Sequence, residues 1–319
     1  MDVEPFMDSA QTPPSEAPSR EGILSKIFLN DKGVRGPWRL LIYASIVAAL
    51  GFSGLLVLQL IVGPSRGIFS LGYWFPYEAL CFSVVFGAAL IMARIENRSP
   101  GVYGLPLKGA FGKLFWQGCL IGLLEVSALI GLIALFGGYA FGDVALHGKE
   151  VLRWALLWAA LFVFVGLFEE FLFRGYTQYT LAESIGFWPA AVVLSLLFGR
   201  VHLSNPGESP AGVAGVVMIA MIFAFALRRT GSLWLVVGWH ASFDFGETFP
   251  YSVPNSGIVF QGHLSNASLH GANWLTGGSA GPEGSIFSFL TMGMLALAIH
   301  FLFPAKKVQI TQSQGKQAN

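Results

Sequence analysis

The stretch WALLWAALFVFVGLFEEFLFR, residues 154–174, decides how this chain folds. Its first part is an unbroken run of Trp, Ala, Leu, Phe, Val and one Gly, typical of a helix inside a bilayer. Glu169, Glu170 and Arg174 follow within the same apolar surroundings. A charge at the centre of a bilayer costs about 3 kcal/mol or more, so ionisable groups kept there are usually functional. The stretch therefore predicts a membrane helix that carries a site.

The composition of the whole chain agrees with this interpretation. Of the 319 residues, 54% are hydrophobic and only 12% are charged, with a mean hydropathy of +0.62. A soluble domain carries about 25% charged residues. The net charge of +1 provides no basic field, so no nucleic-acid partner is expected. Cys81 and Cys119 both lie in apolar runs and predict buried thiols, with no disulfide framework. We predict an all-α, polytopic membrane protein whose first partner is the lipid bilayer.

Apolar segments near the length of a bilayer-crossing helix predict about eight transmembrane helices. These segments cover residues 38–62, 73–93, 114–136, 152–173, 187–203, 211–227, 233–250 and 285–303. We expect the helix that holds Glu169 to run on to Leu181. The expected organisation has three parts: a disordered cytoplasmic tail over 1–37, a transmembrane domain over 38–303 with its catalytic core at about 150–250, and a cytoplasmic tail over 304–319.

Positive charge predicts the orientation. When the N-terminus is placed inside, Lys and Arg concentrate in the inner segments, and the outer segments hold only Arg66, Lys149 and Arg153. Both termini are then cytoplasmic, and we expect a multi-pass protein of the cell inner membrane. The last outer segment, 251–284, is rich in Gly, Ser and Asn, which predicts a flexible cap or an unstructured loop.

Three segments carry the other unusual polar residues, each within or at the edge of an apolar span. They are LFEEFLFRGY (167–176), LLFGRVHLSNP (196–206) and VVGWHASFDFGE (236–247). Residues four apart share one face of a helix, so Glu170 is expected to pair with Arg174. Glu169 is turned about 100° away and left free to act as a base.

The same spacing relates the remaining polar residues to one another. His240 and Asp244 are four residues apart and share one face, and Phe198 stands one turn before His202, where it can pack against the ring. A Glu, two His and an Asp from three helices can bind a divalent metal, zinc being the expected ion, through Glu169, His202, His240 and Asp244. They can instead polarise a water directly, with Glu169 as general base and a histidine as its partner.

The sequence has neither the HExxH nor the Gly-rich phosphate-loop pattern, which leaves zincin and nucleotide-binding functions without support. Each chosen residue also has a structural interpretation: an interior histidine for His202 or His240, a helix cap for Asp244. Among the other ionisable residues, we expect helix-packing or interfacial roles for the acids Glu78, Glu125 and Glu247. Arg200 is expected to have no catalytic role. Solvated loop histidines are expected at His263 and His270.

Taken in order, these motifs resemble a known family. The patterns Glu169-Glu170-x3-Arg174, Phe198-x3-His202 and His240-x3-Asp244, together with RTGSLWLVVGWHASFD (229–244), resemble those of the CPBP family of CAAX-prenyl-protease and bacteriocin-processing intramembrane proteins, also called the Abi family. The resemblance covers about 150–250. It implies an intramembrane endopeptidase that is either a metalloprotease or glutamate-dependent.

The resemblance also implies residue roles. Glu169 and His202 would activate water, His240 and Asp244 would complete the site, and Glu170 and Arg174 would support it. Position 244 departs from the eukaryotic prenyl proteases, which have Asn there. An amide can donate a hydrogen bond to an oxyanion and an ionised carboxylate cannot. Asp244 is therefore expected to be protonated, to orient His240, or to bind a metal.

Two other functions stay open at this point. A non-catalytic immunity or scaffold protein could keep the same fold, and a proton-coupled transporter could use buried Glu and His as relays. Transporters often contain inverted repeats, and we find no internal repeat in the sequence. The leading hypothesis is hydrolysis of a peptide bond in a membrane-associated peptide or a membrane protein.

Overall fold

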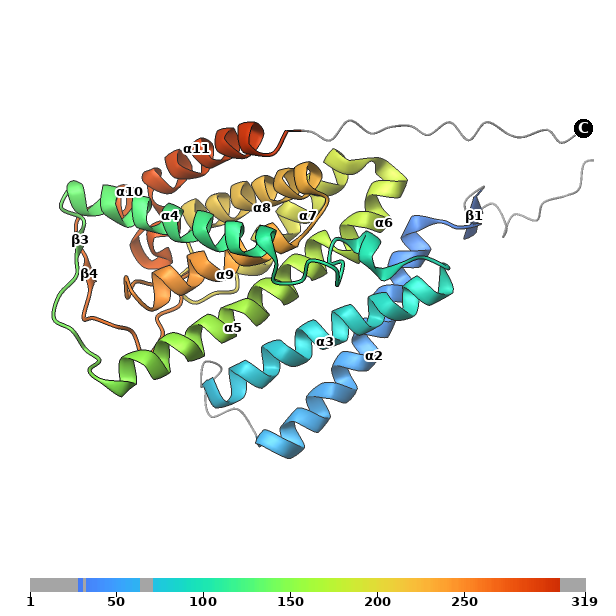
Figure 1. Ribbon diagram of the computed structural model, residues 1–319, viewed down its shortest axis with the longest axis horizontal. Helices are drawn as coiled ribbons and strands as arrows, with labels where there is room; N and C mark the ends of the chain where they lie inside the picture. The colour runs from blue at the N-terminus through green and yellow to red at the C-terminus, as the bar shows by residue number, and fades with distance from the viewer. Residues whose placement is uncertain (1–27, 31–32, 64–70, 305–319) are drawn as a thin grey trace, which may run out of the picture.

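The computed structural model describes residues 28–30, 33–63 and 71–304, and this part of the chain is built almost entirely of helices (Figure 1). The predicted tails over 1–37 and 304–319 lie largely outside the described residues. The α-helices are α2 (Gly36–Val62), α3 (Leu71–Ile95), α4 (Lys113–Leu135), α5 (Lys149–Arg174), α6 (Tyr176–Ile185), α7 (Phe187–His202), α8 (Pro210–Thr230), α9 (Trp234–Thr248), α10 (Asn273–Thr276) and α11 (Ile286–Leu302).

Short 3₁₀ helices and strand pairs complete the described secondary structure. The 3₁₀ helices are η1 (Pro100–Tyr103), η2 (Gly278–Ala280) and η3 (Pro282–Gly284). Strand β1 (Leu29–Asn30) pairs antiparallel with β2 (Gly33–Val34), and β3 (Tyr139–Ala140) pairs antiparallel with β4 (Ser268–Leu269). Each strand is only two residues long, so the pairs fasten loops together and form no sheet that could bury a core.

The membrane-spanning character of the chain is clear from its helix lengths. Within the described residues, 5 helical stretches are long and apolar enough to cross a membrane: Gly36–Val62, Gly72–Ile95, Lys113–Leu135, Lys149–Ile185 and Pro210–Thr230. The helices α7 and α11 are apolar but shorter. These lengths make the chain a multi-pass membrane protein.

A helix is present in each of the eight predicted segments, but α9 differs from the others in kind. It has 15 residues, a rise of about 22 Å, against the roughly 30 Å of a hydrocarbon core. Most of its residues are buried against protein. The apolar run that predicted a span over 233–250 therefore forms an interior helix, which is apolar because it is surrounded by other helices.

Glycines allow α9 to lie close to its neighbours. A Cβ atom at Gly118 or Gly122 of α4 would overlap backbone atoms of α9, and one at Gly238 of α9 would overlap the backbone of α4 at Phe115. Small residues at such positions let helix backbones approach closely, which drives association where lipid removes the hydrophobic effect between helices. Helix α9 also packs extensively on α5, so it lies between α4 and α5.

The expected continuation of α5 to Leu181 is interrupted. Helix α5 ends at Arg174, Gly175 breaks it, and α6 continues to Ile185. A Cβ atom at position 175 would overlap the carbonyl of Phe171, so glycine is needed there. Gly186, with φ of +90°, ends α6. Gly175 therefore ends α5 directly after Arg174.

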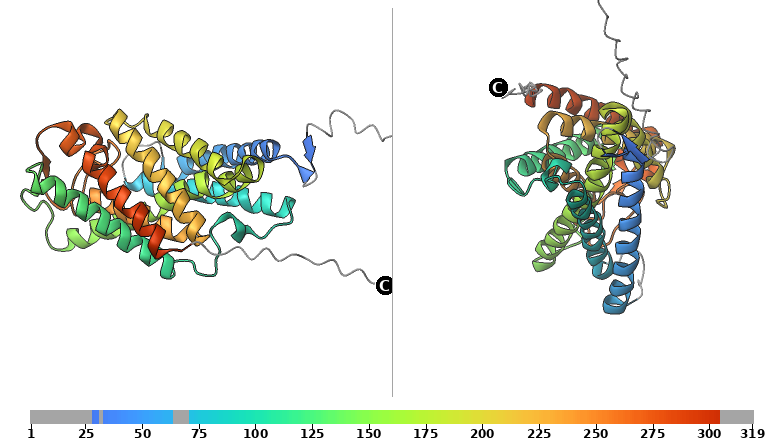
Figure 2. Two further views of the ribbon diagram at one scale, coloured as in Figure 1. Left: turned by 90° about the horizontal axis from the view of Figure 1, so that it is seen from above. Right: turned by 90° about the vertical axis from the view of Figure 1, so that its right-hand side faces the viewer.

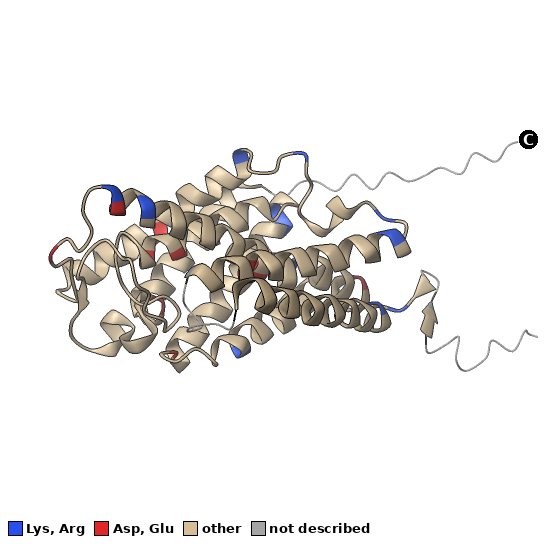
Figure 3. Ribbon diagram, turned by 90° about the horizontal axis from the view of Figure 1, so that it is seen from below, with Lys and Arg blue, Asp and Glu red and all other residues tan. Residues whose placement is uncertain are grey.

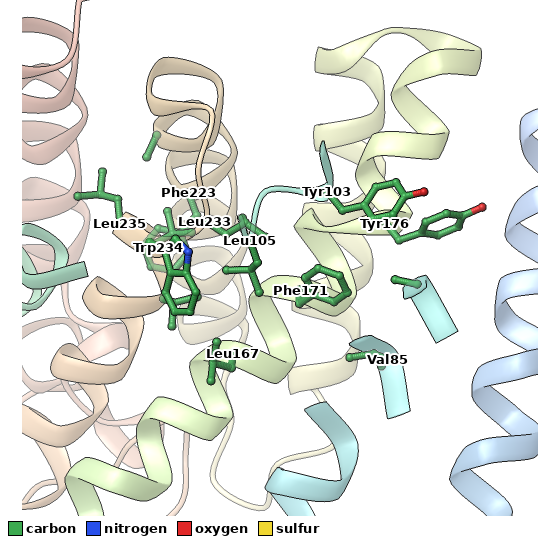
Figure 4. Close-up of a cluster of buried hydrophobic side chains, with 14 of the residues drawn as sticks. Val85, Tyr103, Leu105, Leu167, Phe171, Tyr176, Phe223, Leu233, Trp234 and Leu235 are labelled. Atoms are coloured by element: carbon green, nitrogen blue, oxygen red, sulfur yellow. The ribbon is translucent and has the colours of Figure 1, made fainter. Parts of the chain in front are cut away.

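The main buried cluster joins the C-terminal part of α5 to the start of α9. In Figure 4, Leu167 and Phe171 of α5 lie on one side, Leu233, Trp234 and Leu235 face them, and Tyr103 and Tyr176 pack edge to face just beyond the end of α5. All are at most 6% exposed. This packing fixes the position of α5 relative to α9, and with it the positions of the glutamates of α5.

The segment over 251–284 is a packed cap and not an unstructured loop. It contains β4, α10, η2 and η3, and its residues Ser265 and Ala280 are 0% exposed. In Figures 1 and 2 it gathers with β3 at one end of the helix bundle, opposite α6. Its glycines accept positive φ angles, at Gly257, Gly262, Gly271, Gly277, Gly278 and Gly281, which other residues rarely adopt. The Gly-rich composition therefore reflects tight turns.

Charged residues gather at the helix ends, while most of the length of the helices is free of them (Figure 3). At the end opposite the cap, Arg39 contacts Glu96 at 2.6 Å and Glu183 at 2.5 Å, and Arg98 contacts Glu183 at 2.8 Å. This network ties α2 to the end of α3 and to α6.

Candidate functional site

Helix α5 brings three charged groups to the interior. Arg174 Nη1 lies 3.3 Å from Glu170 Oε1, and the side chains are 2% and 0% exposed, so the pair predicted from the four-residue spacing is present and buried. Glu169 points another way and keeps 25% of its side chain exposed. The two adjacent glutamates therefore have different environments, as the helix geometry predicts.

His240 of α9 lies among three carboxylates. Its Nδ1 is 2.8 Å from Glu170 Oε1, and its Nε2 is 3.4 Å from Asp244 Oδ2 and 3.7 Å from Glu169 Oε2. The oxygen that contacts Arg174 is thus also the oxygen that contacts His240. Ionised carboxylates only accept hydrogen bonds, so a ring that bonds them on both sides carries a proton on each nitrogen. His240 is therefore a hydrogen-bond donor in this arrangement.

His202 ends α7, and its ring is fixed by two contacts. Its Nδ1 lies 2.9 Å from the carbonyl oxygen of Phe198, and the two rings have centroids 4.5 Å apart. A carbonyl only accepts, so Nδ1 carries the proton and Nε2 keeps its lone pair. The predicted packing of Phe198 on His202 is confirmed. The same phenyl ring also lies 4.4 Å from the guanidinium carbon of Arg174, a contact that sequence spacing cannot show.

One cavity of about 230 Å³ brings the predicted residues together. Glu169, His202, His240 and Asp244 all line it, together with apolar side chains of α3, α5 and α8. The cap supplies part of the wall, through Asn255, Ser256, Ile258, Phe260 and Glu283. The cavity therefore joins a polar group of side chains to apolar walls, the usual composition of a ligand site.

Glu283 of the cap was not predicted as part of the site. It lines the cavity and accepts a hydrogen bond from Ser256 Oγ at 2.8 Å. Burial raises the pKa of its carboxyl to about 8, with a further rise from the charge of Asp244. The only sequence signal was one acid in a Gly-rich segment. Asn205 Nδ2 donates to the Ser256 carbonyl at 2.8 Å and holds the α7–α8 turn against the cap.

The other acids in the spans are interior groups, and two of them are bound by tryptophans. Trp74 Nε1 donates to Glu78 at 2.8 Å and Trp239 Nε1 donates to Glu125 at 2.6 Å. Glu247 is 0% exposed. The positions of Glu78 and Glu247 agree with the packing role expected for them, whereas Glu125 also lines the cavity. The remaining expectations concern surface groups: Arg200 and His270 are exposed, His263 bonds the Phe260 carbonyl, and neither loop histidine lines the cavity.

The proposed metal ligands do not form a ligand group. Across the described ranges, no three His, Cys, Asp or Glu side chains are arranged to hold a metal ion. His240 Nδ1 is engaged by Glu170, and its Nε2 already faces two carboxylates. The set Glu169, His202, His240 and Asp244 shares one cavity but is not gathered around one point. Cys81 and Cys119 are free and half-buried.

Comparison with known proteins identifies the part of the chain that contains this site. Residues 151–246 match the family described as type II CAAX prenyl endopeptidase Rce1-like. The match covers less than a third of the chain, from α5 to α9, and includes all three motifs. No curated protein matches the chain. Residues 151–246 are a domain of this protease family.

Proposed function

We propose that the chain is an intramembrane endopeptidase that hydrolyses a peptide bond in a membrane-associated peptide or membrane protein, with Glu169 activating the water. The observation that carries the proposal is the different environment of two adjacent glutamates in one family domain. Glu170 is buried between Arg174 and His240, while Glu169 is partly exposed and lines the cavity beside His240.

Glu169 acts as the general base in this mechanism. It accepts a proton from a cavity water, and the resulting hydroxide adds to the scissile carbonyl. His202 Nε2, whose lone pair is left free by the bond to the Phe198 carbonyl, accepts a hydrogen bond from the same water and orients it. The proton held by Glu169 then passes to the leaving amine.

His240 stabilises the oxyanion in this mechanism. Its Nε2–H faces the cavity side that holds Glu169 and Asp244, and Glu170 fixes the ring through Nδ1. A donor aimed at the developing negative charge stabilises it more strongly between apolar walls than in bulk water. Of the roles left open for Asp244, orientation of His240 fits the 3.4 Å separation.

The requirement for zinc is a separate question. The family is expected to include metalloproteases, and a zinc ion would be held by Glu169, His202, His240 and Asp244 and would supply Lewis-acid activation of water. These side chains do not form such a group in the described structure, and the mechanism above therefore uses only the chain's own residues.

Orientation and access follow from the charge pattern. With both termini cytoplasmic, as the charge pattern predicts, we expect the cap at the outer face of the cell inner membrane, because β3 and the 251–284 segment gather at the end of the bundle opposite α6 (Figure 1). Substrate would then reach the cavity beside the cap. We also retain the division into a tail (1–37), a transmembrane domain (38–303) and a second tail (304–319).

Metal content and cleavage measured on one purified preparation test the proposal. Wild type, Glu169→Ala and His240→Ala are compared on a library of membrane peptides, with Glu150→Ala as a control on the exposed start of α5. Cleavage by wild type and Glu150→Ala, and none by the other two, supports the proposal. Cleavage lost together with stoichiometric zinc in His240→Ala would replace the metal-free mechanism. A wild type that cleaves nothing while Glu169→Ala keeps its cellular phenotype would favour a scaffold protein.

A further inference from the structure

A second cavity, of about 370 Å³, lies at the opposite end of α7 from the first. His202, the last residue of α7, lines the first cavity, and Phe187, the first residue of α7, lines the second. The end of α8 and the turn after η1 complete its wall. Arg174 also lines this second cavity while its Nη1 contacts Glu170 of the candidate site. One side chain therefore touches both regions.

Two buried donors of this cavity are unsatisfied. Arg174 Nη2 and Gln178 Nε2 have no hydrogen-bond partner among the described residues, although Arg174 is 3% exposed and Gln178 2% exposed. Buried polar groups are normally paired, since an unpaired donor loses its hydration without compensation. Two such donors in the wall of one cavity indicate that an acceptor-rich group belongs there.

The charge around the cavity selects an anion. Glu183 is the one acid in the wall, and it is already bound by Arg39 and Arg98. Arg228 stands at the rim, exposed, with its guanidinium carbon 4.8 Å from the Phe187 ring. Guanidinium groups are suited to the oxygens of phosphate. The arrangement therefore offers cationic and neutral donors, and its one carboxylate is already paired.

The apolar walls and the location of the second cavity indicate a ligand that has apolar parts as well as an anionic group. Val102, Phe187 and Leu227 supply apolar surface beside the donors. The cavity lies where α6, α7 and α8 reach the membrane surface opposite the cap, at the level of lipid headgroups in the predicted orientation. Clusters of basic residues at that level attract anionic lipids.

We propose that this second cavity binds a phosphate group, carried by an anionic phospholipid, through Arg174 Nη2, Gln178 Nε2 and Arg228. Free inorganic phosphate offers the same chemistry, and the experiment separates the two sources. The role of the site rests on the proposed function. A phosphate bound to Arg174 weakens the ion pair between Arg174 and Glu170 Oε1, the oxygen that also contacts His240 Nδ1. Bound lipid would thus change the position of His240, the proposed oxyanion donor.

Binding to the full chain in detergent tests the site without any peptidase assay. The probes are dihexanoyl phosphatidylglycerol, the matching diacylglycerol without phosphate, and inorganic phosphate. The variants are Gln178→Leu and Arg228→Gln. Their matched controls are Gln117→Leu on α4 and the exposed Arg94→Gln at the end of α3, neither of which lines the cavity. Loss of one hydrogen bond to a charged group is expected to weaken binding about tenfold.

Each outcome decides the proposal. Phosphatidylglycerol binding that weakens about tenfold in both cavity variants and in neither control, with no diacylglycerol binding, supports a lipid site. The same pattern for inorganic phosphate supports the site with the free ion as its source. Equal binding of diacylglycerol, or equal affinities in cavity and control variants, overturns the proposal. Unfolding temperatures without ligand show that each variant is folded.

A second arm tests the regulatory role. If wild type cleaves peptide, saturating phosphatidylglycerol should change its rate constant, and Gln178→Leu should lose that response while keeping its basal rate. A response that persists in Gln178→Leu refutes the coupling. If wild type cleaves nothing, the proposed function fails, and the binding results still decide the site.

Discussion

Removing the charge of Glu170 or of Arg174 should destabilise the protein far more than removing both. The two side chains are 0% and 2% exposed and lie 3.3 Å apart, so each single change leaves a buried charge without this partner. Breaking such a pair costs about 3–5 kcal/mol, whereas replacing both members is often nearly neutral. We expect Glu170→Gln and Arg174→Met each to lose about 3 kcal/mol or more, and the double variant to lose at least about 2 kcal/mol less than their sum.

The assay is the free energy of unfolding in a mild detergent, measured for the full cycle. The exposed pair Glu150 and Arg153 on the same helix provides the control, with side chains 50% and 64% exposed and a 3.3 Å separation. Its variants Glu150→Gln and Arg153→Met should stay within about 0.5 kcal/mol of wild type and add without coupling. Additive losses for Glu170 and Arg174 would refute the argument that each neutralises the other.

Three further perturbations have expected results. Gly122→Ala should lose about 1–3 kcal/mol of unfolding free energy, because its Cβ overlaps the backbone of α9. The control, Gly131→Ala on the same helix, meets nothing within 4 Å and should be neutral or stabilising. A loss at Gly131 as large as at Gly122 would contradict the close-packing argument. Phe198→Leu removes the ring between His202 and Arg174 and should lower the cleavage rate several-fold with the substrate KM unchanged; an unchanged rate would show that the ring does not position His202. Burial raises the pKa of Glu283 from 4.5 to about 8, so the stability that its protonated form provides is present below pH 4.5 and is lost as pH rises to 8. Glu283→Gln should flatten the pH dependence of the unfolding free energy over that range. An unchanged pH profile would contradict the assignment.

Local spacing on one helix was enough to predict part of the site. Four-residue spacing identified the Glu170–Arg174 pair and the packing of Phe198 on His202, because an α-helix fixes both relations without tertiary information. The apolar segments likewise located the helices, since burial in lipid and burial in protein both select apolar residues.

Contacts between helices could not be read from one sequence. Nothing in the spacing of α5 or α9 shows that Glu170 Oε1 would also meet His240 Nδ1, because that contact depends on how closely α9 approaches α5. The interior position of α9 and the packed cap were hidden for the same reason. A buried helix and a spanning helix look alike in composition, and a Gly-rich segment can encode tight turns as well as flexibility.

The claim that Glu169 is the general base is tested most directly by the rate constant for peptide cleavage in Glu169→Gln, beside Glu78→Gln. Glu78 is an acid of the same membrane interior, 7% exposed, and its amide counterpart can still accept from Trp74. A general base contributes about 10²–10⁴-fold, so we expect a loss of that size in Glu169→Gln and a change of less than about tenfold in Glu78→Gln. A Glu169→Gln variant that keeps more than about a tenth of the wild-type rate constant would contradict the account.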